Sequence, residues 1–187
     1  MLAFCAVNWY KRAEYLRLPS QRRKKMKEID IDALDRAILG ALLEDGRQSQ
    51  VELAERIPLS ATAIARRIRA LEEKGVIQGY QARISRQALG LSMTVIVQIG
   101  LKSQNEDLLK SFEEGVASAP SVISCHLMSG EDDYLVTVMA RDLADFERIH
   151  KEQLSRLPGV ARLKSSFALR EVTNRALPAS SLLPARK

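Results

Sequence analysis

In the first half of the chain, the most informative segment is SQVELAERIPLSATAIARRIRAL, residues 49–71. Ser49 and Glu52 have the spacing of a capping box, so a short helix is predicted to begin there. Pro58 prevents that helix from continuing, because proline lacks the backbone N–H that a helix interior needs. Ser60 can cap the next helix, whose inner face has apolar residues at helical spacing: Ala61, Ile64, Ile68 and Leu71. The stretch therefore predicts two helices joined by a short turn.

Another helix is predicted before this pair. Asp32 and Asp35 place carboxylates at its N-terminus, and its apolar residues recur at spacings of three and four: Leu34, Ile38, Ala41 and Leu42. Gly75 marks the end of the last helix. Three helices with a short turn before the third are typical of a helix-turn-helix domain, whose last helix enters the major groove of DNA. The alternating segment 76–84 predicts a wing or linker strand.

The second half of the chain has a pattern of strands and helices in the order βαββαβ. Alternation predicts strands near 95–101, 122–127, 134–140 and 160–172, and helical spacing predicts helices over 108–116 and 143–157. This order is typical of a ferredoxin-like sheet with two helices on one face. We therefore expect an α+β protein with an N-terminal winged helix-turn-helix domain followed by a ferredoxin-like βαββαβ domain. The uncovered face of the sheet is expected to be apolar and to need a partner.

These patterns divide the 187 residues into five segments. They are a disordered basic leader (1–27), the helix-turn-helix domain (28–75), the wing or linker strand (76–90), the ferredoxin-like domain (91–175) and a flexible tail (176–187). The leader holds eight basic side chains against the one carboxylate of Glu14, which accounts for the net charge of +6. Overall charge is therefore weak evidence for nucleic-acid binding. Residues 22–27 are either a DNA-binding arm or the end of a disordered leader. A start codon placed too far upstream would produce such a leader, since Met26 directly precedes the first patterned helix.

Composition excludes several classes of protein. With 46% hydrophobic and 28% charged residues, the chain is neither collagen-like nor wholly disordered. The most apolar run, residues 88–101, is too short and too polar to span a membrane. The apolar stretch 2–7 precedes the basic cluster, which is the reverse of an export signal. The two cysteines, Cys5 and Cys125, indicate no disulfide framework, so we expect a reducing, cytoplasmic setting. With the predicted DNA-binding domain, we expect the protein to be nucleoid-associated.

The sequence contains no clear catalytic or metal-binding pattern. His126 and His150 lack a second Cys/His pair at zinc spacing, and neither has a nearby nucleophile with an orienting acid. A glycine-rich phosphate loop is also missing. We therefore expect no enzymatic activity, no metal and no cofactor.

The third predicted helix carries the candidate DNA contacts. With its apolar residues turned inward, the outward arc contains three arginines, and residues 60–71 include no acidic side chain. Arginine can bond to guanine and to phosphate, and hydroxyls near a helix N-terminus suit phosphate. A solvated basic helix face is the alternative, but the position after a capped turn favours DNA. The candidate contacts are Ser60, Thr62, Ala63, Arg66, Arg67 and Arg69.

A second candidate site is the acidic turn SGEDDY, residues 129–134, which leads directly into a strand. Its carboxylates lack the alternating spacing of a calcium-binding loop. A carboxylate and a phenol at the mouth of a strand, beside exposed loop backbone, can hold the ammonium and carboxylate of a small zwitterion. A capped hairpin without a ligand is the alternative interpretation.

Together these residues resemble the Lrp/AsnC family of feast/famine transcription regulators, particularly its leucine-responsive branch. The first half matches through residues 32–44, Gly46-Arg47, Glu52-Leu53-Ala54, Leu59-Ser60, residues 66–75 and Ile77-Gln78-Gly79-Tyr80. The second half matches through Cys125-His126-Leu127, Ser129-Gly130, Asp133-Tyr134-Leu135 and Leu157-Pro158-Gly159-Val160. The similarity runs from residue 30 to residue 175, so the leader lies outside it.

The resemblance implies a transcription regulator that binds double-stranded DNA and responds to an amino-acid effector. It also implies homodimers, formed through the linker strand and the sensing domain, that assemble into tetramers or octamers. By the same likeness, the amino acid binds between sensing domains. Gly130, Asp133 and Tyr134 would line the effector site, and Ser155 would select the effector's side chain.

The chain departs from the family pattern at two places. Pro58 replaces a common glycine in the turn, and Ala61 and Ala63 replace prolines that are frequent at the start of the recognition helix.

Two other functions are alternatives to an effector-controlled regulator. One is an architectural DNA-binding protein with little effector control, which would show no thermal shift with any amino acid. The other is an enzyme built on the βαββαβ unit, for which the sequence supplies no nucleophile or cofactor motif.

Overall fold

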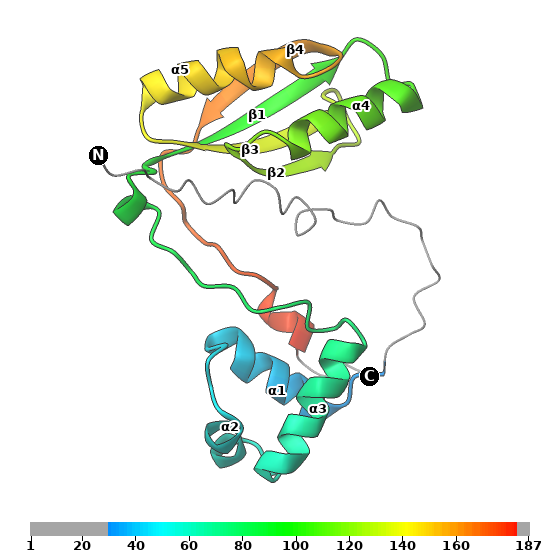
Figure 1. Ribbon diagram of the computed structural model, residues 1–187, viewed down its shortest axis with the longest axis vertical. Helices are drawn as coiled ribbons and strands as arrows, with labels where there is room; N and C mark the ends of the chain where they lie inside the picture. The colour runs from blue at the N-terminus through cyan, green and yellow to red at the C-terminus, as the bar shows by residue number, and fades with distance from the viewer. Residues whose placement is uncertain (1–29, 183–187) are drawn as a thin grey trace, which may run out of the picture. The chain divides into compact units, whose positions relative to one another are not determined.

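The computed structural model describes residues 30–182 of the chain. The predicted leader and Cys5 lie outside the described residues. The described chain folds as two compact units, which we call the helical unit, residues 30–83 with 173–182, and the sheet unit, residues 84–172 (Figure 1). Within these described residues, no helix is both long enough and apolar enough to cross a membrane.

The helical unit contains the three predicted helices, α1 (Ala33–Glu44), α2 (Gln50–Arg56) and α3 (Ala61–Glu73). Each helix begins at a residue whose side chain accepts a hydrogen bond from the backbone N–H three positions later, namely Asp32, Ser49 and Ser60. The facing sides of the helices completely bury Ile38, Leu53 and Ile64. No residue in the turn that contains Pro58 has a positive φ. Among the described residues, only glycines outside this turn have one. The replacement of glycine by proline is therefore compatible with this turn.

Residues 76–84, which were expected to form a wing or linker strand, join no sheet ladder in the described chain. The N–H of Val76 instead donates to the Leu71 carbonyl at the end of α3, 2.9 Å away. Further along, the side chains of Tyr80 and Ile84 are more than half exposed. A strand needs a neighbour to satisfy its backbone groups, and a single chain does not supply one for this segment.

The end of the chain also differs from expectation. Residues from 176 onward were predicted to form a flexible tail, but residues 179–182 form a short 3-10 helix, η5 (Ala179–Leu182), beside α1. No pattern in the sequence indicated this contact, because the segment is too short to show a helical repeat.

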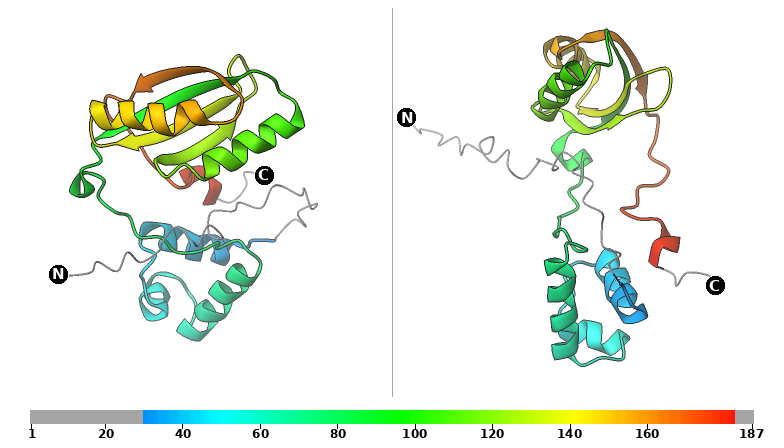
Figure 2. Two further views of the ribbon diagram at one scale, coloured as in Figure 1. Left: turned by 45° about the horizontal axis from the view of Figure 1, so that its top comes forward. Right: turned by 90° about the vertical axis from the view of Figure 1, so that its right-hand side faces the viewer.

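The sheet unit follows the βαββαβ order, which confirms the predicted ferredoxin-like architecture. Its main elements are β1 (Met93–Leu101), α4 (Glu106–Ala117), β2 (Val122–Leu127), β3 (Tyr134–Ala140), α5 (Leu143–Glu152) and β4 (Val160–Phe167). The strands are antiparallel in the order β2-β3-β1-β4, and both helices cover one face of the sheet (Figure 2). The last strand ends at Phe167 rather than Val172, because Phe167 already pairs with Val95 near the start of β1.

The helix-covered face of the sheet forms the core of this unit. Buried aliphatic side chains of β1 and β3 pack there with Phe112 of α4 and Phe146 of α5. Gly159, just before β4, has a φ of +72°, and a Cβ at this position would lie 2.6 Å from Leu108 Cδ1. Only glycine satisfies both constraints, so the turn into β4 depends on it.

The opposite face of the sheet is mixed rather than apolar, which corrects the expectation from alternation. On the two central strands, the apolar Ile96, Leu135 and Met139 lie diagonally to one another and alternate with Thr94, Gln98 and Thr137. The edge strands add polar side chains on the same face: Ser124 and His126 from β2, and Lys164 and Ser166 from β4. This face therefore mixes apolar and polar side chains on the central strands as well as on the edge strands.

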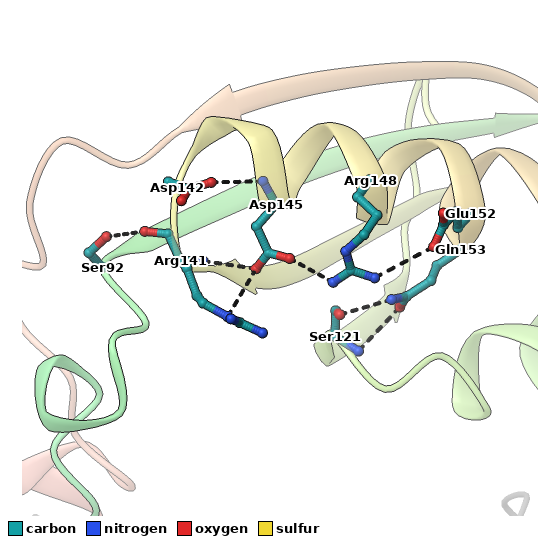
Figure 3. Close-up of polar contacts among 8 residues, drawn as sticks. All are labelled: Ser92, Ser121, Arg141, Asp142, Asp145, Arg148, Glu152 and Gln153. Carbon is teal, nitrogen blue, oxygen red and sulfur yellow. Dashed lines mark hydrogen bonds and ion pairs between the residues drawn. The ribbon is translucent and has the colours of Figure 1, made fainter.

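Polar contacts fix α5 to the sheet (Figure 3). Before its first turn, the Ser92 hydroxyl donates to the Arg141 carbonyl, which ties the entry of β1 to the start of the helix. At its end, the Gln153 side-chain amide donates to the Ser121 hydroxyl at 3.0 Å, just before β2. Successive ion pairs run along the helix through Arg141, Asp145, Arg148 and Glu152. Both ends of α5 are thus held against strand ends.

Candidate DNA-binding and effector sites

One face of α3 presents most of the side chains that the sequence nominated for DNA. Arg66, Arg69 and Thr62 are exposed. Ser60 is exposed as well, and its Oγ accepts a hydrogen bond from the N–H of the half-buried Ala63 at 3.2 Å. Within residues 30–182, neither exposed arginine forms an ion pair with a carboxylate. Both guanidinium groups are therefore available to an external anion.

Arg67 differs from the other residues predicted to face DNA. Its Nη1 atom lies 2.7 Å from Asp32 Oδ2 and 2.7 Å from Asp35 Oδ1, both at the start of α1. The helical repeat explains this placement, because position 67 follows Ile64 by three residues and precedes Leu71 by four. Arg67 therefore lies beside the buried face, where it joins α3 to α1 instead of pointing outward with Arg66 and Arg69.

The same contact shifts the pKa of Asp32 and that of Arg67. The N–H of Asp35 and then the Arg67 guanidinium lower the pKa of Asp32 below its usual value. The carboxylates of Asp35 and Asp32 in turn raise the pKa of Arg67. The Asp35 side chain is only 12% exposed, so it depends on Arg67 as its counter-ion.

We expect the helical unit to lose stability in acid through Asp32. Because its pKa is lower in the folded than in the unfolded chain, its contribution is present above an unfolded pKa of about 3.9 and disappears as the pH falls through the folded value. Asp32→Asn keeps a capping side chain but removes the titrating group. Denaturant unfolding from about pH 6 to pH 3 should show a smaller loss for this variant. Equal losses in both proteins would contradict the assignment.

The start of the linker packs against α3 beside Glu72. The sequence did not predict this contact. The Tyr80 hydroxyl donates to Glu72 of α3 at 3.1 Å. Its ring lies beside Gly46, where an added Cβ would be 3.5 Å from a ring carbon. A surface pocket of about 330 Å³ lies between these elements and includes Arg69 in its wall. Alternation alone had marked Tyr80 only as a strand residue.

In the sheet unit, Asp133 joins the acidic turn to the connection between β1 and α4. Its Oδ2 accepts from the Leu101 N–H at 2.6 Å, and its Oδ1 accepts from the Gln104 side-chain amide at 2.5 Å. The register of β1 against β4 shifts at Gly100 and Leu101, so this carboxylate supports an irregular point of the strand. Each oxygen keeps a further lone pair, which leaves room for one more donor.

Tyr134, nominated for the effector site, lies in the core of the unit. Its side chain is 1% exposed, because it pairs with Ile99 on the helix-covered face, and its ring packs on Phe112 with 4.4 Å between centroids. The hydroxyl donates to Glu113 at 2.9 Å. Burial and then Glu113 raise the pKa of Tyr134, so the phenol stays protonated. Burial, with a smaller effect of Glu113, also raises the pKa of the neighbouring Cys125 to about 11.

The turn itself is open at Gly130, which is exposed. Arg162 of β4 neutralises part of its charge, since it donates to Asp132 at 2.7 Å and lies 3.6 Å from Glu131. In the part of the chain that the structure describes, the backbone N–H groups of residues 129–132 form no hydrogen bond. The turn thus combines free backbone donors with the adjacent carboxylate of Asp133.

Ser155 lies on a different element, η4 (Leu154–Arg156), between α5 and β4. The starts of β3 and β4 both lie beside the end of β1, so the turn and η4 precede strands that begin at the same end of the sheet (Figure 1). The Ser155 hydroxyl is 3.3 Å from His150 Nδ1. Among the described residues it forms no hydrogen bond with the other predicted effector residues, Gly130, Asp133 and Tyr134.

Both units of the chain are similar to known protein families. Residues 31–78 match a winged helix-turn-helix DNA-binding family, and residues 94–178 match the Lrp/AsnC ligand binding domain. Over 149 residues, the chain is 43% identical to the Bkd operon transcriptional regulator of Pseudomonas aeruginosa, covering 80% of this chain and 97% of that protein. The chain belongs to the Lrp/AsnC family. The predicted family, and with it the function of a transcription regulator rather than an enzyme, is confirmed.

Other Lrp/AsnC proteins are similar over the same range. The leucine-responsive regulatory protein of Escherichia coli K12 is 38% identical, with 80% of this chain and 91% of that protein covered. A transcriptional regulator from Neisseria meningitidis, solved with L-methionine, gives a TM-score of 0.77 at 32% identity, covering 82% of this chain and 100% of that one. A feast or famine regulatory protein from M. tuberculosis was also solved with L-methionine. It gives a TM-score of 0.69 at 30% identity, covering 80% of this chain and 99% of that one.

Proposed function

We propose that this Lrp/AsnC regulator binds double-stranded DNA through the exposed face of α3, and that an amino acid bound by the sheet unit changes its DNA affinity or its assembly. The observation that carries the proposal is the contrast among three arginines of one helix. Arg66 and Arg69 are exposed and unpaired, whereas Arg67 anchors the helix to α1. Side chains held on an anchored helix are suited to reach base edges and phosphates.

The proposed DNA contacts divide by position along α3. Ser60 and Thr62 lie at the helix N-terminus, where hydroxyl and backbone donors suit a phosphate. Arg66 and Arg69 lie further along the helix, where an arginine can form two hydrogen bonds to guanine. Ala63 lies between these groups and offers only a methyl group, which allows close approach to the groove.

The proposed effector is an amino acid recognised by its ammonium and carboxylate groups. Two structural relatives were solved with L-methionine. In this chain the unpaired N–H groups around Gly130 suit a carboxylate, and the free lone pairs of Asp133 suit an ammonium. Tyr134 supports this turn from the core, and Ser155 is proposed to contact the effector's side chain when two sheet units assemble.

A thermal-shift screen with the twenty common amino acids tests the effector proposal. A ligand at 100 times its dissociation constant stabilises a folded protein by about 2.7 kcal/mol, which raises the melting temperature measurably. We expect at least one amino acid to do so, and Ser155→Leu to change which one acts. If none of the twenty shifts the wild-type protein, the chain binds DNA without amino-acid control.

We also expect the free protein to be a homodimer or a larger assembly. The open sheet face carries Ile96, Leu135 and Met139 among polar side chains, and the linker region exposes Tyr80, Ile84 and Leu89. Surfaces of this kind are normally covered by a second chain. Sedimentation at micromolar concentration without DNA should give at least twice the chain mass of 20.9 kDa. A well-folded monomer under these conditions would refute the expectation.

A further inference from the structure

The chain passes between its two units twice. The first passage is the linker before η3 (Gln87–Leu89), and the second follows β4 and returns residues 173–182 to the helical unit. On this second passage, Leu169 and Val172 are 99% and 83% exposed, so the segment has left the core of the sheet unit. It ends in η5 beside α1.

Two contacts hold η5 against α1. Arg36 Nη1 donates to the Ser181 carbonyl at 3.2 Å. Leu182 lies over Gly40, so that a Cβ added to Gly40 would be 3.7 Å from Leu182 Cδ1. The 3-10 turn is also ordered internally, because the Ser181 N–H and hydroxyl both donate to the Pro178 carbonyl, at 3.0 and 2.7 Å.

These contacts use a side of α1 that the core of the helical unit leaves free. Arg36 and Gly40 are four residues apart and therefore lie on one side of the helix. Ile38 and Ala41 are buried in the core and lie on another side. Glycine costs about 1 kcal/mol relative to alanine inside a helix, and here it lies where Leu182 approaches the backbone. A side chain longer than alanine at position 40 would occupy the place of Leu182.

We propose that this side of α1 is a docking surface for the chain's own residues 178–182, and that the docked segment is a second tether that limits the motion of the helical unit. Within one chain the linker has no ladder partner among the described residues, so its own residues give the helical unit only one covalent connection, whether or not a second chain covers the linker. Docking of η5 adds a second fixed point on α1. The tether rests on contacts within one chain and does not depend on the identity of the effector.

Hydrogen exchange on the full-length protein tests the tether with two matched variants, Gly40→Ala and Gly40→Leu. Alanine and leucine have similar helix propensities, so a difference between the variants reports on the space that Leu182 needs. We expect Gly40→Ala to protect α1 and residues 176–182 at least as well as wild type. Gly40→Leu should accelerate exchange in both segments by about threefold or more, relative to Gly40→Ala.

A chain that ends at Arg175 and an Arg36→Ala variant complete the test. Truncation should accelerate exchange of α1 as Gly40→Leu does, and Arg36→Ala should do so more weakly without adding any bulk to the helix. Light scattering should give the wild-type number of chains per particle for every variant. Equal exchange in Gly40→Ala and Gly40→Leu, together with no effect of truncation, would overturn the proposal. A change in the number of chains per particle on truncation would also overturn it, because the segment would then act between chains.

Discussion

Replacing Arg66 with alanine is expected to weaken DNA binding about tenfold or more and to lower its dependence on salt. Arg66 is exposed on α3 and pairs with no carboxylate in the described chain. A lost base contact costs about 1–3 kcal/mol, and a lost phosphate contact removes roughly one unit from the slope of log K against log salt. Fluorescence anisotropy at several salt concentrations, on a DNA fragment that the protein selects from a random pool, measures both quantities.

Arg67→Met is the matched comparison, since it also removes one guanidinium from α3. Because Arg67 pairs with Asp32 and Asp35, its loss should leave the salt slope unchanged. The free energy of unfolding should instead fall by about 1–3 kcal/mol, because the buried Asp35 carboxylate loses its partner. Lys110→Ala, in the sheet unit, controls for the loss of one charge. If Arg67→Met lowers the salt slope as Arg66→Ala does, Arg67 contacts DNA directly.

Asp133→Ala is expected to abolish binding of the amino acid that gives the largest thermal shift. The substitution removes the proposed partner of the effector's ammonium and also the acceptor for the Leu101 N–H and the Gln104 amide. An ammonium left unpaired in a partly buried site costs several kcal/mol, which exceeds the total binding energy of a weak ligand. Isothermal calorimetry should therefore detect no heat of binding.

Asp133→Asn separates the two roles of this carboxylate. Asparagine keeps a carbonyl oxygen that can accept from the Leu101 N–H, but it carries no charge. We expect near-wild-type melting and an affinity at least about 100-fold lower, since charge-assisted hydrogen bonds are the stronger kind. Undiminished affinity in the asparagine variant would show that Asp133 only holds the turn against the β1–α4 connection.

The parts of the fold that the sequence predicted correctly depend on short-range chemistry. Asp32, Ser49 and Ser60 cap helices through N–H groups three residues away, and Pro58 ends a helix wherever the chain goes next. The order of strands and helices in the sheet unit follows from alternation and helical spacing in the same way. These features need no knowledge of which distant segments meet.

The residues whose contacts the sequence did not predict have partners that are distant along the chain. Leu101 is 32 residues before Asp133, so nothing near the turn indicated that this carboxylate would be engaged within the chain. The linker around Tyr80 alternates as a strand does, yet a ladder requires a second segment. Arg67 is the exception. It was predicted to face outward, although its spacing from Ile64 and Leu71 along the helix corresponds to a position beside the buried face.

The raised pKa of Cys125 has a practical consequence for labelling this protein with thiol-reactive dyes. With a pKa of about 11, only about one Cys125 side chain in 3,000 is a thiolate at pH 7.5, the form that attacks a maleimide. An exposed cysteine of ordinary pKa is ionised roughly 300 times more often at that pH. Thr62→Cys on the outer face of α3 should therefore take up a fluorophore selectively once Cys5 is replaced. The half-buried thiol of the sheet unit can stay in place as a silent residue.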